Sequence, residues 1–306
     1  MSARTAPTSA WLPLLPGLAV AALASVPAGA QTVQSAAEVV AAATDDEWRG
    51  LDPDNTVYFE LEGGRVVVEL APWAAPRHVE ALRAIVRGGH YDGAPVVRSQ
   101  DNYVAQWRVA PPAEGASLPG SPYDALAAEF TTTSGGLPFT PLPDPDVYAA
   151  EAGFVRGFPV GRAPGSGAAW IAHCYGTVAV PRGNDPDAAS PAGLYAVTGH
   201  APRHLDRNAT VVGRVVQGME HLTTLRRGTG TLGFYETPEE RPLIRSARMG
   251  SDLDPADRAA VEVLRTDSES FRAYVLASRT RTEEWFVHPT GRIELCNVRI
   301  PVRPVP

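Results

Sequence analysis

The pattern of apolar and polar residues changes along the first third of the chain from the period of a strand to the period of a helix. Residues 56–61 (TVYFEL) and residues 65–70 (RVVVEL) are short runs rich in β-branched and aromatic residues, separated by Glu62-Gly63-Gly64. Two such runs joined by a glycine-containing turn predict a β-hairpin. Between Pro76 and Gly88 the apolar residues recur at three- and four-residue steps, which predicts an amphipathic helix.

Further short apolar runs predict additional strands, because turn residues such as Gly, Pro, Asn and Asp separate them. These runs cover residues 96–97, 103–107, 170–180, 194–197, 210–216 and 243–249. Residues 218–225 predict one more short helix. Strands outnumber helices in this region of residues 56–250, so the predicted fold class is mainly β.

Two segments on the N-terminal side and in the middle of the chain break this pattern. Residues 31–55 begin with apolar residues at helical spacing, so we expect a short N-terminal helical segment. Residues 111–167 are rich in Pro, Gly, Ser and Thr and have little periodicity, which predicts a long insertion of loops. Loops of this length are usually functional or disordered, but a surface cover is the interpretation favoured here.

Residues 251–306 form a C-terminal extension with its own pattern. Ala260, Val263 and Leu264 lie at helical spacing with later apolar residues, which predicts a helical region after Ser251. Asp267-Ser268 is a candidate second N-cap within that region. Residues 293–298 predict one edge strand. The extension is too short to bury a core alone, so we expect it to pack against the strand-rich domain.

Composition narrows the functional classes. The 306 residues are 44% hydrophobic and carry a formal net charge of −7, which argues against a nucleic-acid partner because phosphate neutralisation needs a basic face. The sequence contains no lysine. This excludes Schiff-base chemistry on a lysine and the phosphate-binding lysine of a P-loop. We expect no cofactor.

Residues 1–30 are typical of an export signal. Arg4 precedes a mostly apolar run, and Ala28-Gly29-Ala30 offers a small-residue cleavage site before Gln31. The alternative is an uncleaved membrane anchor, but the apolar run is broken by prolines and is shorter than the roughly 20 residues that a span needs. We therefore expect an exported, periplasmic or secreted protein with no membrane span in the mature chain.

The possible metal ligands and thiols are few. Cys174 and Cys296 are the two cysteines. In an oxidising compartment they pair or remain two buried thiols, and their spacing favours neither. His200 and His204 are four residues apart, but Pro202 between them argues against the helix that would point both at a metal. We predict no metal site.

Two separated blocks of the sequence resemble the cyclophilin-type peptidylprolyl isomerases. The first is GRVVVELAPWAAPRHVEALRAIVRGGHYDGAPVVRSQDNYVAQ, residues 64–106. It has the family's order of strand, helix, YDG turn, apolar pair, arginine and glutamine. The second lies within residues 176–230 and contains a Leu-Asp turn followed by TVVGRVVQGM. The resemblance implies a cyclophilin-like closed antiparallel β-barrel capped by helices, with the insertion and the C-terminal extension added to it.

The resemblance also implies an activity, the cis/trans isomerisation of Xaa-Pro bonds in exported polypeptides, and residues that perform it. Arg98 stands at the position of the family's catalytic arginine, and Gln106 at that of the glutamine that hydrogen-bonds the substrate backbone. The positions that line the family's proline pocket are occupied by Tyr103, Val104, Tyr195, His204 and Leu205. An arginine suits this reaction because it is a permanent cation with a preorganised planar fork.

Several positions depart from the family pattern. Tyr195 replaces the pocket phenylalanine, and the histidine expected after the Leu-Asp turn is Ala209. These changes keep the arginine and the glutamine but enlarge the pocket or make it more polar. The alternative function is therefore a weakly active or inactive module of the same fold that binds proline-containing peptides. A serine hydrolase is disfavoured because the sequence has no G-x-S-x-G motif.

Overall fold

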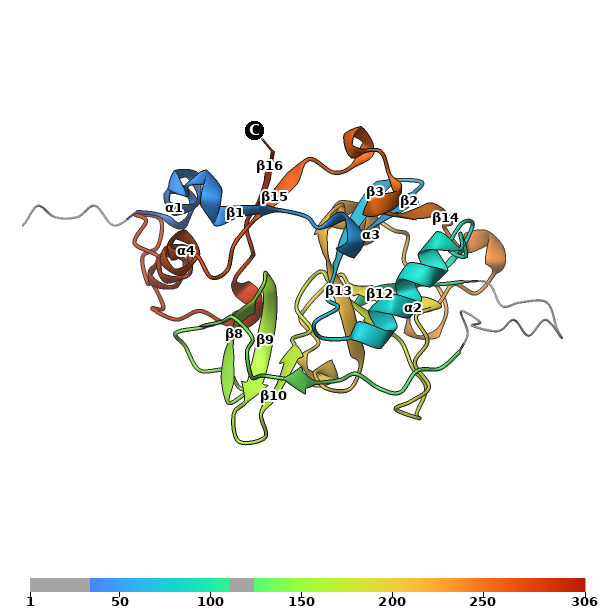
Figure 1. Cartoon of the computed structure of the whole chain (residues 1–306), viewed down its shortest axis with the longest axis horizontal. Helices are drawn as coiled ribbons and strands as arrows, with labels where there is room; N and C mark the ends of the chain where they lie inside the picture. Colours follow the sequence, from blue (N-terminus) through green and yellow to red (C-terminus); the bar gives the residue numbers. More distant parts are fainter. Residues whose placement is uncertain (1–33, 110–123, 306) are drawn as a thin grey trace, which may run out of the picture. The chain divides into compact units, whose positions relative to one another are not determined.

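The computed structural model describes residues 34–109 and 124–305, so the predicted signal segment of residues 1–30 lies outside the described residues. Its largest sheet has eight antiparallel strands in the order β14-β2-β3-β13-β11-β12-β5-β4 (Figure 1). These strands are β2 (Thr56–Leu61), β3 (Gly64–Leu70), β4 (Val96–Ser99), β5 (Val104–Arg108), β11 (Thr177–Val180), β12 (Gly193–Val197), β13 (Thr210–Gln217) and β14 (Ile244–Met249). The predicted hairpin of β2 and β3 is confirmed, since Leu61 pairs with Gly64 and Thr56 with Glu69.

The eight strands form a nearly closed barrel, because the two outer strands of the sheet meet. Main-chain hydrogen bonds from Ile244 N to Ala94 O and from Val96 N to Pro242 O, each 2.8 Å long, join the two edges. The barrel interior is filled by apolar side chains of alternating strand positions, including Phe59 and Trp107. The mainly β fold class predicted from the sequence is therefore confirmed.

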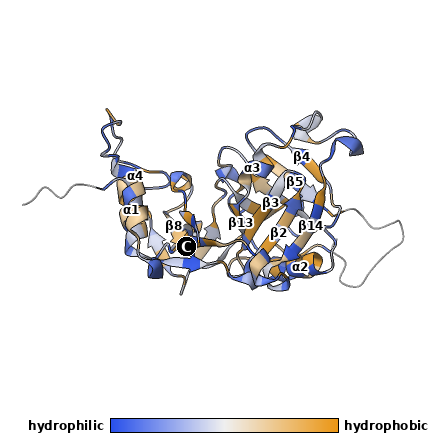
Figure 2. Cartoon of the chain, turned by 90° about the horizontal axis from the view of Figure 1, so that it is seen from above, coloured by the Kyte–Doolittle hydropathy of each residue, from blue (hydrophilic) through white to orange (hydrophobic). Residues whose placement is uncertain are grey.

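Helix α2 (Pro76–Arg87) covers one end of the barrel and lies beside β2 and β14 in Figure 2. It buries Val79, Leu82, Ile85 and Val86 in the barrel core, as the periodicity predicts. The shorter helix α3 (Met219–Thr223) follows Gly218, which has a φ of 89°. A Cβ atom at Gly218 would lie 2.1 Å from the carbonyl oxygen of Arg65, so only glycine fits this turn.

The insertion contains a sheet, which corrects the prediction that residues 111–167 consist of loops. The sheet has the order β6-β10-β9-β8-β7. Its strands are β6 (Thr132–Thr133), β7 (Phe139–Pro141), β8 (Glu151–Val155), β9 (Phe158–Ala163) and β10 (Ala168–Ile171). The glycines that weaken the strand pattern have a packing role here: a Cβ atom at Gly161 would lie 2.6 Å from the ring of Trp170. Residues 110–123 lie outside the described residues.

A third sheet, of order β1-β15-β16, joins the two ends of the chain. Its strands are β1 (Trp48–Gly50), β15 (Val261–Leu264) and β16 (Val302–Pro304). The helix predicted around Ala260 to Leu264 is therefore wrong: β15 pairs with strands on both sides, and this long-range pairing overrides the local helical spacing. The edge strand predicted at residues 293–298 is also wrong, because residues 295–297 form a 3₁₀ turn.

Two helices complete the fold near this third sheet. Helix α1 (Ala36–Ala42) and helix α4 (Glu269–Thr280) lie side by side (Figures 1 and 2). The predicted N-cap is confirmed, since the Ser268 hydroxyl accepts a hydrogen bond from Phe271 N. The 3₁₀ turns are Asp45–Glu47, Pro53–Asn55, Arg203–Leu205, Thr231–Gly233, Pro238–Glu240, Gly250–Asp252, Pro255–Asp257 and Leu295–Asn297. No helix within the described ranges is long and apolar enough to cross a bilayer.

A second hydrophobic core combines three distant parts of the chain. Trp48 from β1, Phe154 from β8 and Phe271 from α4 belong to one buried cluster. Cys174 and Cys296 lie in the same cluster and form a disulfide. Of the two alternatives that the sequence left open, pairing is therefore the one observed. Most of the extension therefore packs against the N-terminal segment and the insertion. Its first residues contact the barrel, where Ala259 N donates to the Tyr58 hydroxyl at 3.0 Å.

A third cluster lies between the barrel and the inserted sheet. Phe158, Val160 and Ile171 of the inserted strands pack against apolar residues of β5, β11, β12 and β13. These barrel residues are not part of the interior cluster, so they occupy the outer face of the strands. The insertion thereby covers part of the outer face of the barrel, and the predicted site residues lie on this same face.

Candidate active site

Arg98 and Gln106 lie directly opposite each other on neighbouring strands. The register of β4 and β5 pairs Arg98 with Gln106, next to an irregularity between Val96 and Arg98. The register of β5 and β12 in turn pairs Gln106 with Tyr195. Directly opposed residues of antiparallel strands point to the same face of a sheet, so the three side chains form one row across three strands. Tyr195 belongs to the outer cluster, which places this row outside the barrel.

The guanidinium of Arg98 is held in a fixed position. Its Nε donates to the Leu232 carbonyl oxygen at 2.7 Å, and its Nη2 donates to Gln100 Oε1. Its central carbon lies 5.3 Å from the ring centre of Tyr103 and 5.1 Å from that of Phe234. Burial lowers the pKa of Arg98, and the neighbouring Tyr103 partly offsets this. The guanidinium still stays charged, because arginine is not deprotonated in proteins.

Two of the predicted pocket residues form a wall next to Arg98. The rings of Tyr103 and His204 stack almost in parallel, with a 9° angle and 6.4 Å between their centres. Tyr103 directly precedes β5 at the end of the turn from β4, and His204 lies on the exposed side of the 3₁₀ turn Arg203–Leu205. The cation, the tyrosine ring and the histidine ring therefore follow one another along the surface.

The remaining predicted pocket residues form an apolar floor. Val104 and Tyr195 are buried in the outer cluster, and Leu205 and Tyr103 pack against its edge. Val104 pairs with Val197 on β12, two residues beyond Tyr195, so both strands present apolar side chains on this face. The structure thus brings together all seven residues that the sequence predicted. An apolar floor beside a fixed cation and an amide suits a proline ring and its adjoining peptide bond.

The hydroxyl of Tyr195 does not face solvent. It is 3.0 Å from Nε2 of His173, and Nδ1 of the same ring is 3.2 Å from Oδ1 of Asp206. Burial raises the pKa of Tyr195 above its usual value. Burial also acts to raise the pKa of Asp206, but hydrogen bonds from His173 and the charge of Arg203 outweigh it and leave that pKa lowered. Asp206 is therefore ionised at neutral pH.

Some residues of the site were not identified from the sequence. Leu232 and Phe234 reach Arg98 from the loop that follows α3, and Phe234 forms an isolated bridge with Arg98. Gln100 lies in the turn after β4. The contacts of Leu232 and Phe234 depend on how their loop folds over the edge strand β4. No local sequence motif indicates this folding. His173 was not identified either, because its burial beside Tyr195 is a tertiary feature.

A groove on the described part of the chain lies apart from the candidate active site. It has a volume of about 530 Å³, and its lining includes Trp73, Phe158 and Arg156 but not Arg98 or Gln106. Arg98 and Gln106 therefore do not belong to this groove. Within residues 34–109 and 124–305, no group of three or more His, Cys, Asp or Glu side chains is arranged to hold a metal ion.

Comparisons with known proteins agree with this geometry. Residues 56–249 match the family of cyclophilin type peptidyl-prolyl cis-trans isomerases/CLD. Probable peptidyl-prolyl cis-trans isomerases from Brucella suis and Brucella abortus are each 28% identical over 178 residues, which is 58% of this chain and 74% of theirs. The crystal structure of cyclophilin AquaCyp293 from Hirschia baltica aligns with a TM-score of 0.69 and 28% identity, over 86% of this chain and 96% of that chain.

The likeness to the Hirschia baltica protein extends beyond residues 56–249, because it covers a larger share of this chain than the family match does. Segments outside the barrel are therefore part of the similarity. The fold, the arginine-glutamine pair on the outer face of the barrel and these matches lead to one assignment: the chain belongs to the family of cyclophilin type peptidyl-prolyl cis-trans isomerases.

Proposed function

We propose that this cyclophilin-type isomerase acts on Xaa-Pro bonds of exported polypeptides, with Arg98 as the catalytic cation and Gln106 as the anchor of the substrate backbone. The observation that carries the proposal is the pairing of these two residues across β4 and β5, beside an apolar floor. Proline-containing polypeptides are the partners that this site would take.

The chemistry requires no bond to be made or broken. Resonance in the peptide bond creates a barrier of about 18–20 kcal/mol to rotation. A donor to the prolyl nitrogen weakens that resonance, because the nitrogen becomes pyramidal and gains a lone pair during rotation. Arg98 is a suitable donor, since its position is fixed by Leu232 and by two aromatic rings before substrate arrives. A preorganised donor needs no reorganisation during the reaction.

The other residues would hold the substrate while the bond turns. The amide of Gln106 has both a donor and an acceptor, so it can bind the backbone on one side of the proline. Val104, Tyr195 and Leu205 would receive the proline ring. Tyr103 and His204 would form the adjacent wall, where their stacked rings are next to the cation.

The isomerisation rate of a short Xaa-Pro peptide tests the catalytic role. We expect Arg98→Ala to lower kcat/KM by about 10²–10³-fold, the effect of losing one preorganised donor. Arg245→Ala is the matched control, because Arg245 is exposed on β14, and it should retain wild-type activity. If wild type does not accelerate isomerisation but still binds proline peptides, the protein is a binding module of the same fold. Equal activity of wild type and Arg98→Ala would remove Arg98 from the mechanism.

The proposed export of the protein rests on two supports. Residues 1–30 have the pattern of a cleavable signal, and Cys174 and Cys296 are joined as a disulfide. Disulfides form and persist in oxidising compartments such as the periplasm. N-terminal sequencing of the protein from fractionated cells tests this. A periplasmic or secreted protein that begins at Gln31 is expected, and an intact N-terminus in the cytoplasmic fraction would contradict the proposal.

A further inference from the structure

A hydrogen-bonded chain leads from the floor of the candidate pocket into the interior. The Tyr195 hydroxyl is 3.0 Å from Nε2 of His173. The two rings lie nearly parallel, with 6.2 Å between their centres. His173 is completely buried. Because the carboxylate of Asp206 can only accept hydrogen bonds, Nδ1 of His173 must carry a proton. In the neutral ring, Nε2 is then the acceptor and Tyr195 is the donor.

The same chain also reaches the wall of the pocket. Asp206 directly follows Leu205 and closes the 3₁₀ turn that carries His204 and Leu205. Its Oδ1 accepts from the backbone nitrogen of His173 at 2.8 Å, and its Oδ2 accepts from Nε of Arg203 at 2.6 Å. His173 thus contacts the floor residue with one ring nitrogen and the wall turn with the other nitrogen and its backbone.

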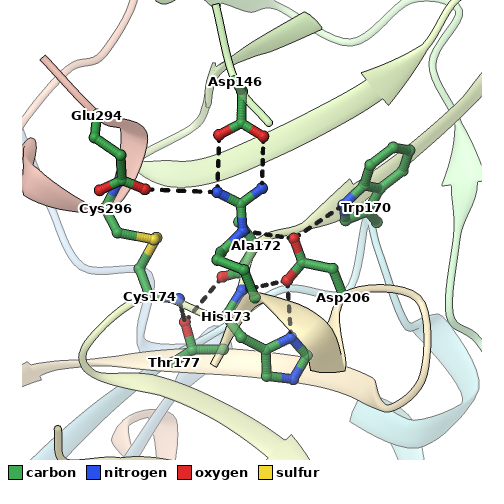
Figure 3. Close-up of a disulfide and its surroundings, with 10 residues drawn as sticks. Asp146, Trp170, Ala172, His173, Cys174, Thr177, Asp206, Glu294 and Cys296 are labelled. Carbon is green, nitrogen blue, oxygen red and sulfur yellow. Dashed lines mark hydrogen bonds and ion pairs between the residues drawn. A yellow bond between two sulfur atoms is a disulfide. The ribbon is translucent and has the colours of Figure 1, made fainter. Parts of the chain in front are cut away.

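The anchor of this chain lies outside the barrel. Arg203 forms two hydrogen bonds with Asp146 of the insertion, at 2.9 and 3.1 Å. The residue after His173 is Cys174, which is bonded to Cys296 of the C-terminal extension. Figure 3 shows His173 directed at Asp206, with the disulfide and Asp146 on neighbouring segments. Both added segments therefore hold the position of His173 and of the wall turn.

We propose that His173 is a positioning residue of the isomerase site: it fixes the distance between the Tyr195 floor and the His204–Leu205 wall, and so sets which Xaa-Pro segments fit. This inference rests on the proposed function. His173 is buried behind Tyr195 and acts through it, without touching the substrate. The role explains why a tyrosine at the floor is compatible with an apolar pocket, since its hydroxyl is bonded away from the proline ring.

Tyr195→Phe is the primary test, because it removes one hydroxyl and keeps the ring. KM and kcat are measured on a panel of Xaa-Pro peptides that differ in the residue before proline. We expect KM to rise about three- to tenfold, the equivalent of one hydrogen bond, with kcat within about twofold and a changed order of preference in the panel. His173→Phe removes the same contact and also the bond from Nδ1 to Asp206, so KM should rise at least as much. The double variant should be no worse than His173→Phe alone.

His173→Gln is the conservative variant, since its amide can replace Nε2 in the bond to Tyr195, and it should restore KM toward the wild-type value. Three results would overturn the inference: an unchanged KM in Tyr195→Phe, multiplication of the single effects in the double variant, or a fall in kcat as large as that of Arg98→Ala. The last result would mean that the hydroxyl takes part in the reaction.

Failure of this inference can be distinguished from failure of the proposed function. Wild type and Arg98→Ala report whether the site catalyses isomerisation at all. If wild type binds proline peptides without catalysis, the dissociation constants of the same variants replace KM and the same comparisons apply. If it binds no proline peptide, the inference fails with the proposed function. Thermal unfolding of each variant identifies a misfolded protein, and Tyr195→Phe, with its near-identical volume, then decides the outcome.

Discussion

The disulfide between Cys174 and Cys296 should contribute strongly to stability, because it joins residues 122 positions apart. A crosslink restricts the unfolded chain by an amount that grows with the logarithm of the closed loop. For a loop of this length the chain-entropy relation gives about 5 kcal/mol. Reduction of the wild-type protein is the cleanest perturbation, since it changes no side-chain volume. Replacement of the cysteines would also disturb the second core, where Cys174 is buried.

Urea unfolding of the oxidised and the reduced protein measures this effect. We expect the free energy of unfolding to fall by about 5 kcal/mol on reduction, with a larger dependence on urea because the reduced unfolded chain exposes more surface. The double variant Cys174→Ala/Cys296→Ala is the matched control. It should unfold at one urea concentration whether or not reductant is present, which excludes an effect of the reductant itself.

A difference below about 1 kcal/mol between oxidised and reduced protein would refute the reasoning, because that is well under the typical 2–4 kcal/mol of a disulfide. Thiol titration of the oxidised protein in urea then separates two explanations. Two free thiols would mean that the cysteines do not pair. No free thiols would mean that the unfolded chain stays compact without the crosslink, so that closing the loop costs little.

Two further predictions concern stability. The pKa of buried His78 is lowered by desolvation more than its hydrogen bond to Glu129 raises it, so the unfolded state binds the proton more tightly. His78 therefore contributes stability above its unfolded pKa of about 6.5 that is lost as pH falls toward its folded pKa. His78→Gln should flatten the pH dependence of unfolding free energy between pH 7 and 5; an unchanged slope would contradict this. Phe154→Ala should lower the free energy of unfolding in urea by about 3–5 kcal/mol, because Phe154 is buried in the second core. Val147→Ala is the control, since Val147 is 92% exposed, and it should lower that free energy by under about 0.5 kcal/mol. Similar losses in the two variants would refute the role of the second core.

The barrel strands and α2 could be predicted from the sequence because their signals are local, whereas closure into a barrel was implied by the family resemblance. The hairpin of β2 and β3 has a clear strand pattern and a glycine turn, and α2 has a clear helical period. The segment of β15 was wrongly predicted as a helix because Val263 and Leu264 fit either period. Only its pairing with β1 and β16 shows that this segment is a strand, and the β1 pairing joins residues more than 200 positions apart along the chain. Glycine in the inserted strands weakened their pattern for a different reason, since it makes room for Trp170.

In the candidate site, too, the residues with a local sequence signal were predicted and those that depend on long-range contacts were not. Arg98 and Gln106 were identified from a motif, and the strand register explains why residues eight positions apart are neighbours. Phe234 and Leu232 were missed because a loop brings them to Arg98 from more than 130 residues away. His173 was missed as a partner of Tyr195 because a buried polar contact between two distant segments leaves no periodic signal. Their roles in catalysis stay predictions that the proposed variants test.

The second core has a consequence for the order in which the protein acquires its structure. Its apolar residues come from β1 near the N-terminus, from the insertion and from the end of the chain, such as Trp48, Phe154 and Leu295. During synthesis the barrel strands up to Met249 are complete before the last of these residues emerges. Until then Trp48 and Phe154 lack part of their native cover, and exposed apolar surface of this kind promotes aggregation. A protein truncated after residue 260 should therefore bind general chaperones more strongly than the full-length protein does.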